Sequence, residues 1–225
     1  MPRCKLIFSL DVQKKREFER WLDLTCRVVS FYKIGFVPFV SLGPWALRSV
    51  KKRKKKIFLD LKFFDIPHTM VRSCLKLMEE GIDIVDFHLF QNKENLKMTL
   101  DEIRTQAKKR RLKIPLFLGV SVLTSVPGKS PLIKQVLSLC RKAKEVGLDG
   151  VILSGREAPL VRREMGKDFK IACPGIRLGP SGDDQKRVVA PFQVKDVADF
   201  VVVGRPILES KDPLKVISKI NSQLQ

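Results

Sequence analysis

The segment at 57–70, IFLDLKFFDIPHTM, places charged side chains at the end of an apolar run that has the pattern of a strand. Asp60 and Lys62 are two residues apart, so on a strand both side chains point to the same side of the sheet. Charged groups rarely lie together at the end of a buried strand unless they are paired or take part in chemistry. This segment therefore predicts a charged site, with Asp65 just beyond it.

Polar side chains also lie at or near the ends of other strand-like runs. Asp11 ends the first run, Lys33 lies in the second, and Ser121 ends the fifth, with Thr124 just beyond it. Carboxylates and ammoniums that alternate within a few ångströms keep one another ionised. Because buried ion pairs stabilise a fold less well than apolar packing does, we prefer a reactive electrostatic site to a purely structural ion-pair cluster.

A second group of residues near the C-terminus has the composition of a phosphate site. PGIR at 174–177 follows the seventh strand-like run, and GRP at 204–206 follows the eighth. Backbone amides after the last two strands of a barrel commonly bind phosphate, and an arginine adds a bidentate cation. The alternative is an ordinary surface loop with a turn-forming Gly-Arg-Pro.

Strand-like and helix-like segments alternate from end to end, which predicts a (β/α)8 TIM barrel of the α/β class. A doubly wound open sheet is the rival, but the turn after the first strand, DVQK, lacks the glycines typical of that fold. We expect one catalytic domain over residues 1–225. The predicted strands are 6–11, 30–35, 57–62, 82–88, 115–121, 150–154, 170–173 and 199–204. The predicted helices are 14–27, 39–52, 69–80, 94–111, 131–146, 156–166 and 212–223, with a short one near 193–197.

The composition favours a cytoplasmic protein. No apolar run approaches the length of a membrane helix, and the N-terminal run is too short for a signal peptide. The five cysteines are scattered, without a CxxC pair, which indicates reduced thiols and argues against zinc. With only His68 and His88 as histidines, no metal site is expected.

The formal net charge is +20, and the densest basic runs are KKRKKK at 51–56 and KKRR at 108–111. Both runs precede strand-like segments, so we expect them to end helices, where cations complement the helix dipole. Binding of nucleic acid is the alternative, but no RNA-recognition motif or aromatic stacking pattern accompanies the runs. A basic surface would also attract an anionic substrate.

The residues after Lys62 have two interpretations. Pro67 can start the next helix, with His68 in its first turn. Asp65 could cap that helix, and from the residues alone this role ranks level with a catalytic one. His88, at the end of the fourth strand, is expected to be hydrogen-bonded in the mouth of the barrel.

Taken together, these segments resemble orotidine 5'-phosphate decarboxylase of the bacterial type over nearly the whole chain. The resemblance is carried by LIFSLDV, YKIG, FLDLKFFDIPHT, GVSVLTS, GLDGVILSGRE, CPGIR followed by DQKR, and VVVGRPI. The DxKxxD pattern alone is shared with sugar-phosphate decarboxylases and aldolase-like synthases of the same superfamily. An Mg²⁺-dependent enzyme of that kind is therefore the alternative, although Ile66-Pro67 after the pattern favours the first family.

The resemblance implies a carboxy-lyase that converts orotidine 5'-monophosphate to UMP in de novo pyrimidine biosynthesis, without metal or organic cofactor. Lys33, Asp60, Lys62 and Asp65 would form the catalytic array, with Lys62 as the proton donor. Asp65 would reach into the neighbouring subunit's site, so the active unit would be a homodimer. The implied substrate-binding residues are Asp11, Lys33, Asp60, Ile66, Thr69, Thr124, Arg177, Gln185, Gly204 and Arg205.

Two segments depart from the family pattern. After His88 the chain has Leu89-Phe90-Gln91-Asn92, where a smaller, glycine-containing stretch is usual. The 177–185 loop is slightly shorter than expected, with Leu178 in place of a usual proline. We expect both loops to be reshaped while the charged array is unaffected.

Overall fold

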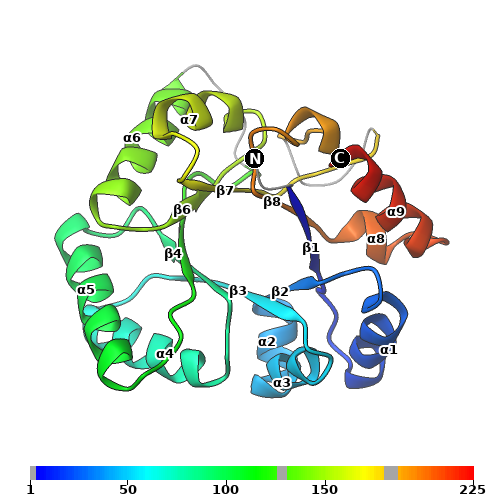
Figure 1. The fold of residues 1–225 in the computed structure, drawn as a ribbon, viewed down its shortest axis with the longest axis horizontal. Coiled ribbons are helices and arrows are strands. Elements are labelled where there is room, and N and C mark those ends of the chain that lie inside the picture. The colour runs from blue at the N-terminus through cyan, green and yellow to red at the C-terminus, as the bar shows by residue number, and fades with distance from the viewer. Residues whose placement is uncertain (1–3, 126–130, 180–186) are drawn as a thin grey trace.

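Eight parallel strands close into a barrel in chain order, and β8 pairs with β1 (Figure 1). The structure is a computed structural model that describes residues 4–125, 131–179 and 187–225. The fold is the (β/α)8 barrel that the alternation predicted. The strands are β1 (Lys5–Ser9), β2 (Phe31–Gly35), β3 (Lys56–Phe63), β4 (Ile84–His88), β5 (Leu116–Val120), β6 (Gly150–Ile152), β7 (Lys170–Cys173) and β8 (Phe200–Val203).

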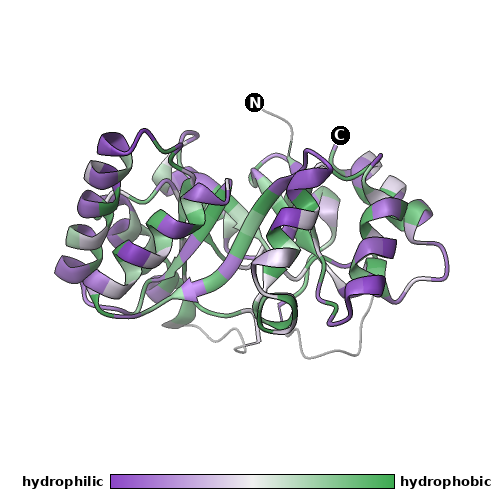
Figure 2. Ribbon diagram, turned by 90° about the horizontal axis from the view of Figure 1, so that it is seen from below, coloured by the Kyte–Doolittle hydropathy of each residue, from purple (hydrophilic) through white to green (hydrophobic). Residues whose placement is uncertain are grey.

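Helices form the outer ring and turn their apolar sides toward the strands (Figure 2). In α1, Phe18, Trp21 and Leu22 recur at helical spacing, and all three are buried. The helices are α1 (Lys15–Thr25), α2 (Phe36–Leu42), α3 (Pro44–Lys52), α4 (Pro67–Glu79), α5 (Lys93–Lys109), α6 (Pro131–Glu145), α7 (Ala158–Met165), α8 (Arg205–Leu208) and α9 (Pro213–Gln223), with a 3-10 helix at Pro191–Gln193.

Apolar side chains fill the interior of the barrel at its base, the end where the strands begin. This inner cluster comprises Ile7, Phe31, Phe58, Ile84, Leu118, Ala172, Phe200 and Val202. Side chains two residues further along a strand point to the same side, one layer closer to the mouth, where the strands end. On the first four strands that next layer is polar: Ser9, Lys33, Asp60 and Asp86. The interior of the barrel is therefore apolar at the base, and the next layer of side chains forms a polar floor for the mouth.

Three elements differ from the prediction. The single helix predicted at 39–52 is two helices, because Gly43 takes a left-handed φ of 59° and Pro44 starts a new helix. The short helix expected near 193–197 is instead the 3-10 turn at Pro191–Gln193. The four-residue α8 was not predicted, because it is too short to show a periodic pattern.

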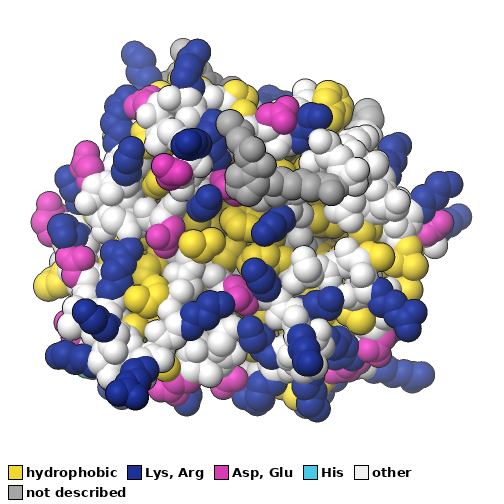
Figure 3. All heavy atoms as spheres, viewed as in Figure 1, with side chains coloured by type: hydrophobic (Ala, Val, Ile, Leu, Met, Phe, Trp, Pro, Cys, Tyr) yellow, Lys and Arg dark blue, Asp and Glu magenta, His cyan; other side chains and the backbone are white. Residues whose placement is uncertain are grey.

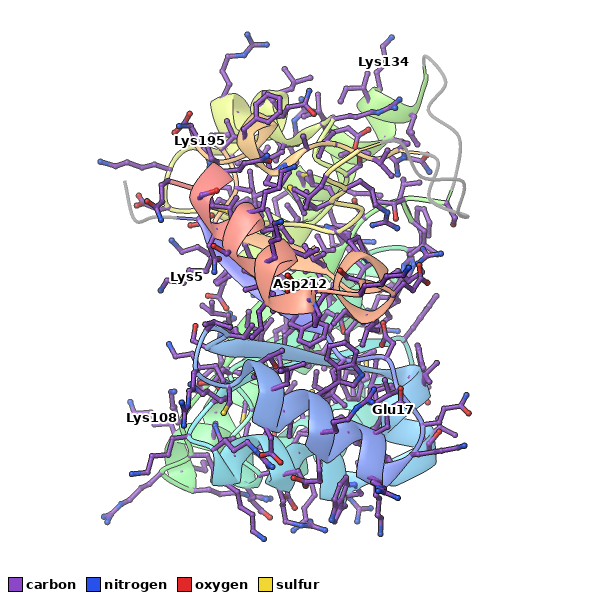
Figure 4. All side chains as sticks on the ribbon, turned by 90° about the vertical axis from the view of Figure 1, so that its right-hand side faces the viewer. Lys5, Glu17, Lys108, Lys134, Lys195 and Asp212 are labelled. Carbon is purple, nitrogen blue, oxygen red and sulfur yellow. The ribbon has the colours of Figure 1, made fainter. Side chains whose placement is uncertain are left out.

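The basic runs lie where helices end, as predicted. Lys51 and Lys52 form the last turn of α3, and Lys108 and Lys109 the last turn of α5. Helix ends and strand starts share the base, so cations collect there: Figure 4 shows Lys5 and Lys108 on one side of the barrel and Glu17 on the other. Figure 3 views this base and shows lysine and arginine side chains outnumbering acidic ones around an apolar centre.

Among the described residues, no helix combines the length and apolar character needed to cross a membrane. All five cysteines are free, and four of them are buried.

Candidate active site

A cavity of about 320 Å³ opens at the mouth of the barrel, a size typical of small-molecule sites. Its floor is the polar layer described above, and its walls come from the segments that follow the strands. Eight of the predicted site residues line it: Asp11, Lys33, Asp60, Lys62, Thr124, Arg177, Gly204 and Arg205. The structure therefore brings together residues from six of the eight strand ends, as the barrel interpretation required.

Asp60 lies at the centre of the charged residues. Its Oδ2 is 2.9 Å from Lys33 Nζ, and its Oδ1 accepts a hydrogen bond from Lys62 Nζ. Lys33 Nζ is also 3.6 Å from Asp11 Oδ1, and the second oxygen of Asp11 accepts a hydrogen bond of 2.6 Å from Ser9 Oγ. Together Asp11, Lys33, Asp60 and Lys62 form an alternating chain of charges, which we call the charged array.

Gly35 makes room for the charged array. A Cβ at this position would lie 2.8 Å from Lys33 Nζ and 3.3 Å from Asp11 Oδ1. A side chain at this position would therefore displace the Lys33 ammonium from its place between the two carboxylates. The glycine of the YKIG segment thus allows a close approach and does not serve an unusual backbone conformation.

The charges of the array keep one another ionised. Burial disfavours the charged form of Asp60, but Lys33 and Lys62 outweigh burial and hold the pKa of Asp60 well below its usual range. Burial likewise disfavours the charged form of Lys33, yet the carboxylates of Asp60 and Asp11 raise its pKa above the ordinary value. Lys33 and Asp60 are therefore both charged at neutral pH.

The backbone at Lys62 is strained. Its φ of 48° lies in the left-handed region that non-glycine residues rarely adopt. The pairing of β3 with β4 changes register between Leu59 and Phe63, so the strand is irregular where it carries the array. The predicted contact between Lys62 and Asp60 is present, although a regular strand does not explain it.

Asp86 on β4 belongs to the site and was missed by the sequence analysis. It is fully buried, and its Oδ1 accepts hydrogen bonds from the backbone N–H groups of Leu61 (3.1 Å) and Lys62 (2.8 Å). Burial, followed by the carboxylate of Asp60, raises the pKa of Asp86 well above the usual range. One signal was available: Asp86 is the lone acidic residue inside the apolar run IVDFH.

The wall of the cavity formed by the segments after β7 and β8 carries the residues predicted to bind phosphate. Arg205 begins α8 directly after Gly204, and Arg177 is buried with its Nη1 donating to the carbonyl of Ile176. Gly204 lies close to β1, because a Cβ there would be 3.1 Å from the Cβ of Ser9. Gln185, the remaining residue predicted for this wall, lies outside the described residues.

A second buried ion pair, also missed, connects the walls. Arg187 Nη1 donates to Glu157 Oε1 at 2.7 Å, and Nη2 donates to the carbonyls of Val122 (3.0 Å) and Leu123 (2.9 Å). The hydroxyl of Ser154 donates to the carbonyl of Arg187. Arg187 thus fixes the segment after β5, which carries Thr124, to the start of α7. Its position in the polar DQKR segment gave no signal of burial.

Asp65, Ile66 and Thr69 do not line the cavity. All three are exposed beyond the end of β3. The capping interpretation of Asp65 is wrong: α4 begins at Pro67 with Ile66 as its N-cap and no side-chain cap, and Asp65 Oδ1 accepts a hydrogen bond from the N–H of Ile66, which lies outside the helix.

The histidines occupy the expected places. His68 lies in the first turn of α4. His88 ends β4, its Nδ1 accepts a hydrogen bond from the N–H of Phe90, and its ring packs against Phe64. Among residues 4–125, 131–179 and 187–225, no three His, Cys, Asp or Glu side chains group as metal ligands would.

Comparisons with known proteins point to one family. A family model described as "Orotidine 5'-phosphate decarboxylase / HUMPS family" matches residues 4–220. The orotidine 5'-phosphate decarboxylase of Gloeothece citriformis is 35% identical over 235 residues, which covers 100% of this chain and 99% of that protein. The orotidine 5'-phosphate decarboxylase of Geotalea uraniireducens is 34% identical over 233 residues, which covers 99% of this chain and 95% of that protein. The crystal structure of the decarboxylase from Lactobacillus acidophilus matches with a TM-score of 0.83 at 28% identity, covering 99% of both chains.

Proposed function

The chain belongs to the orotidine 5'-phosphate decarboxylase / HUMPS family, and from this premise we propose that it converts orotidine 5'-monophosphate to UMP and CO2. The proposal places this carboxy-lyase reaction of pyrimidine biosynthesis in the cytoplasm, without metal or organic cofactor. The observation that carries it is the charged array, which lines the same cavity of about 320 Å³ as Arg177 and Arg205.

The charged array suits a decarboxylation that has no electron sink. Loss of CO2 leaves the bonding electron pair on C6 of the pyrimidine, where no conjugated group can take it up. Asp60, held ionised, would repel the substrate carboxylate and so favour the transition state in which that charge departs. Lys62 would stabilise the pair on C6 and then transfer its proton there, which completes UMP.

The rest of the cavity would bind and orient the nucleotide. Arg177, Gly204 and Arg205 would hold the phosphate through guanidinium and backbone N–H groups. Asp11 and Lys33 would contact the ribose hydroxyls, and Thr124 the pyrimidine. Gln185 would join the phosphate side. Binding energy from the distant phosphate would fix the ring against Lys62.

We further propose a homodimer that completes each site with Asp65, Ile66 and Thr69 of the partner subunit. Large apolar side chains are exposed beyond the ends of β2, β3 and β4, on the side of the mouth where Asp65 lies. This apolar mouth surface comprises Phe36, Val37, Val40, Phe64, Ile66 and Phe90. A patch of this kind marks an interaction surface more often than bare solvent.

The activity is tested by following the absorbance of orotidine 5'-monophosphate with purified protein and no added metal. We expect turnover that EDTA leaves unchanged, and Lys62→Ala should reduce it by at least about 10⁴-fold. The matched control is Lys113→Ala at the base, which should keep full activity. An inactive wild type, or an active Lys62→Ala protein, contradicts the proposal. Activity abolished by EDTA supports the Mg²⁺-dependent alternative.

The shared site is tested by mixing two inactive variants. In a dimer of Lys62→Ala and Asp65→Ala subunits, one site keeps both Lys62 and the partner's Asp65. Random exchange of subunits should therefore restore about a quarter of wild-type activity. If Asp65 acts within its own subunit, mixing restores nothing.

A further inference from the structure

Asp86 is the buried acidic group that the proposed chemistry does not use. It occupies the interior layer of β4 next to Lys33 and Asp60, and it lines the floor of the cavity. Its side chain is fully buried, so it has lost its hydration entirely. An acidic group in that position must be neutral or fully compensated.

The hydrogen bonds of Asp86 act on the backbone of the proposed proton donor. One oxygen, Oδ1, accepts from two consecutive N–H groups, those of Leu61 and Lys62. These two donors lie where β3 loses its register with β4 and where Lys62 takes its left-handed φ. Without an acceptor here, the strand would relax toward an extended conformation, and Lys62 Nζ would move away from Asp60.

The other oxygen of Asp86 points to the charge state of the group. Oδ2 receives no hydrogen bond from any residue that the structure describes. The neighbouring acidic group is Asp60, which Lys33 and Lys62 keep ionised and whose charge helps to raise the pKa of Asp86. Two carboxylates side by side in a buried floor cannot both ionise without strong repulsion, so one of them retains its proton.

We propose that Asp86 is a positioning residue that works in its neutral form. Through Oδ1 it holds the strained backbone of Lys62, and through its Oδ2–H group it donates a hydrogen bond to Asp60. It thereby fixes both the donor and the carboxylate of the reaction without adding a negative charge to the floor. Asp86 transfers no proton to the substrate, so it is not a catalytic residue itself.

The titratable groups around Asp86 lie on the neighbouring strands β2 and β3, on helix α4 and on β4 itself. They are Asp60 and Lys62 on β3, Lys33 on β2, Cys74 on α4 and His88 at the end of β4 itself. Of these, Asp60 is the acidic group that, after burial, most disfavours the charged form of the Asp86 carboxyl. Burial and the charge of Asp60 therefore favour the neutral form of the Asp86 carboxyl group. The side-chain amide of asparagine has a similar shape and is also neutral, so it can replace that form.

The test compares Asp86→Asn with Asp86→Ala. Asparagine keeps an oxygen acceptor for the two N–H groups and an N–H donor for Asp60, so its kcat should stay within about fivefold of wild type. Alanine removes both, and because misplacing a reacting group by about 1 Å costs on the order of 100-fold, kcat should fall by about that factor. KM should stay unchanged in both, since the proposed phosphate contacts come from the segments after β7 and β8 and not from β3 or β4.

The matched control is Asp149→Ala at the base, which removes a carboxylate that accepts the N–H of Phe117 at 2.7 Å. It should lose stability but keep kcat. The infrared difference spectrum between wild type and Asp86→Asn at neutral pH should also show the carbonyl band of one protonated carboxyl group.

This inference rests on the proposed function only for the rate measurements, because the infrared band needs no substrate. A wild type inactive on orotidine 5'-monophosphate would count against the proposed function alone. The inference itself is overturned if the difference spectrum lacks the band, if Asp86→Asn is as slow as Asp86→Ala, or if folded Asp86→Ala keeps its kcat. Should the alanine variant fail to fold, the infrared band and the asparagine variant decide.

Discussion

Carboxylates that are buried or nearly so accept backbone N–H groups of a neighbouring strand at both ends of the barrel, but their other contacts differ. At the base, Asp83 accepts from the N–H of Ile57 and pairs with Lys51 and Lys113. Asp199 accepts from the N–H of Ile171 and pairs with Arg162 and Lys170. At the mouth, Asp86 accepts two N–H groups, but its second oxygen has no hydrogen-bond partner among the described residues, and its neighbouring charge is the carboxylate of Asp60.

The difference shows that the surroundings, not the residue type, decide what a buried aspartate does. Two cations around one carboxylate make a closed ion pair that joins strands and has no capacity left for a ligand. At the mouth two acidic groups compete for the charge, so one is ionised between lysines and the other stays neutral. This uneven arrangement leaves Asp60 charged and facing the cavity, as a reactive site requires.

Removing the charge at the mouth should have the largest effect. Asp60→Asn leaves two ammoniums without their shared carboxylate, so kcat should fall on the order of 10³-fold. Steady-state kinetics at saturating substrate measure this, with circular dichroism to confirm the fold. A kcat within tenfold of wild type would mean that the array is structural, like the base.

Removing a carboxylate at the base should act on stability instead. Asp199→Ala leaves Arg162 and Lys170 without their partner, and breaking this partly buried pair should lower the free energy of unfolding by about 2 kcal/mol. Urea unfolding measures it. The exposed Asp168→Ala serves as a control and should change stability by less than about 0.5 kcal/mol. Loss of kcat in folded Asp199→Ala would refute the division of roles.

The pH dependence of stability should separate Asp86 from the base carboxylates. Because its pKa is raised in the folded state, Asp86 holds a proton that the unfolded chain has released, so wild-type stability falls as pH rises above the unfolded pKa of about 4. Asp86→Asn removes this dependence. The stability of the variant relative to wild type should grow by up to about 1.4 kcal/mol per pH unit. Urea unfolding of both proteins between about pH 5 and about pH 8 tests this, and a constant difference contradicts it.

The smallest effect is expected for one cation at the base. The side chain of Lys113 is 79% exposed. When Lys113 is removed, Asp83 still pairs with Lys51 and still accepts the N–H of Ile57. Lys113→Ala should therefore change the free energy of unfolding by less than about 0.5 kcal/mol. A larger loss in thermal unfolding would show that the base needs both cations.

The sequence predicted the features that depend on local periodicity. Alternation of segments predicted the barrel, and the two-residue spacing of Asp60 and Lys62 predicted their contact. Asp86 was missed because its role depends on an irregular register between β3 and β4, which no local pattern records. Arg187 was missed for a similar reason, since its partners lie 30 to 65 residues away along the chain. The break of the second helix depended on a positive φ at Gly43 that the pattern alone did not reveal.

The left-handed backbone of Lys62 also limits how this position can change during evolution. The residues that adopt such a backbone easily are glycine, asparagine and aspartate, and none of them carries an ammonium. Every substitution that would relieve the strain therefore removes the proton donor. Residue 62 therefore cannot be substituted without loss of function. Substitutions are tolerated instead on the neighbouring strand β4, which holds the backbone of Lys62. Residue 86 is then expected to vary only among side chains that can accept two N–H groups and donate one hydrogen bond.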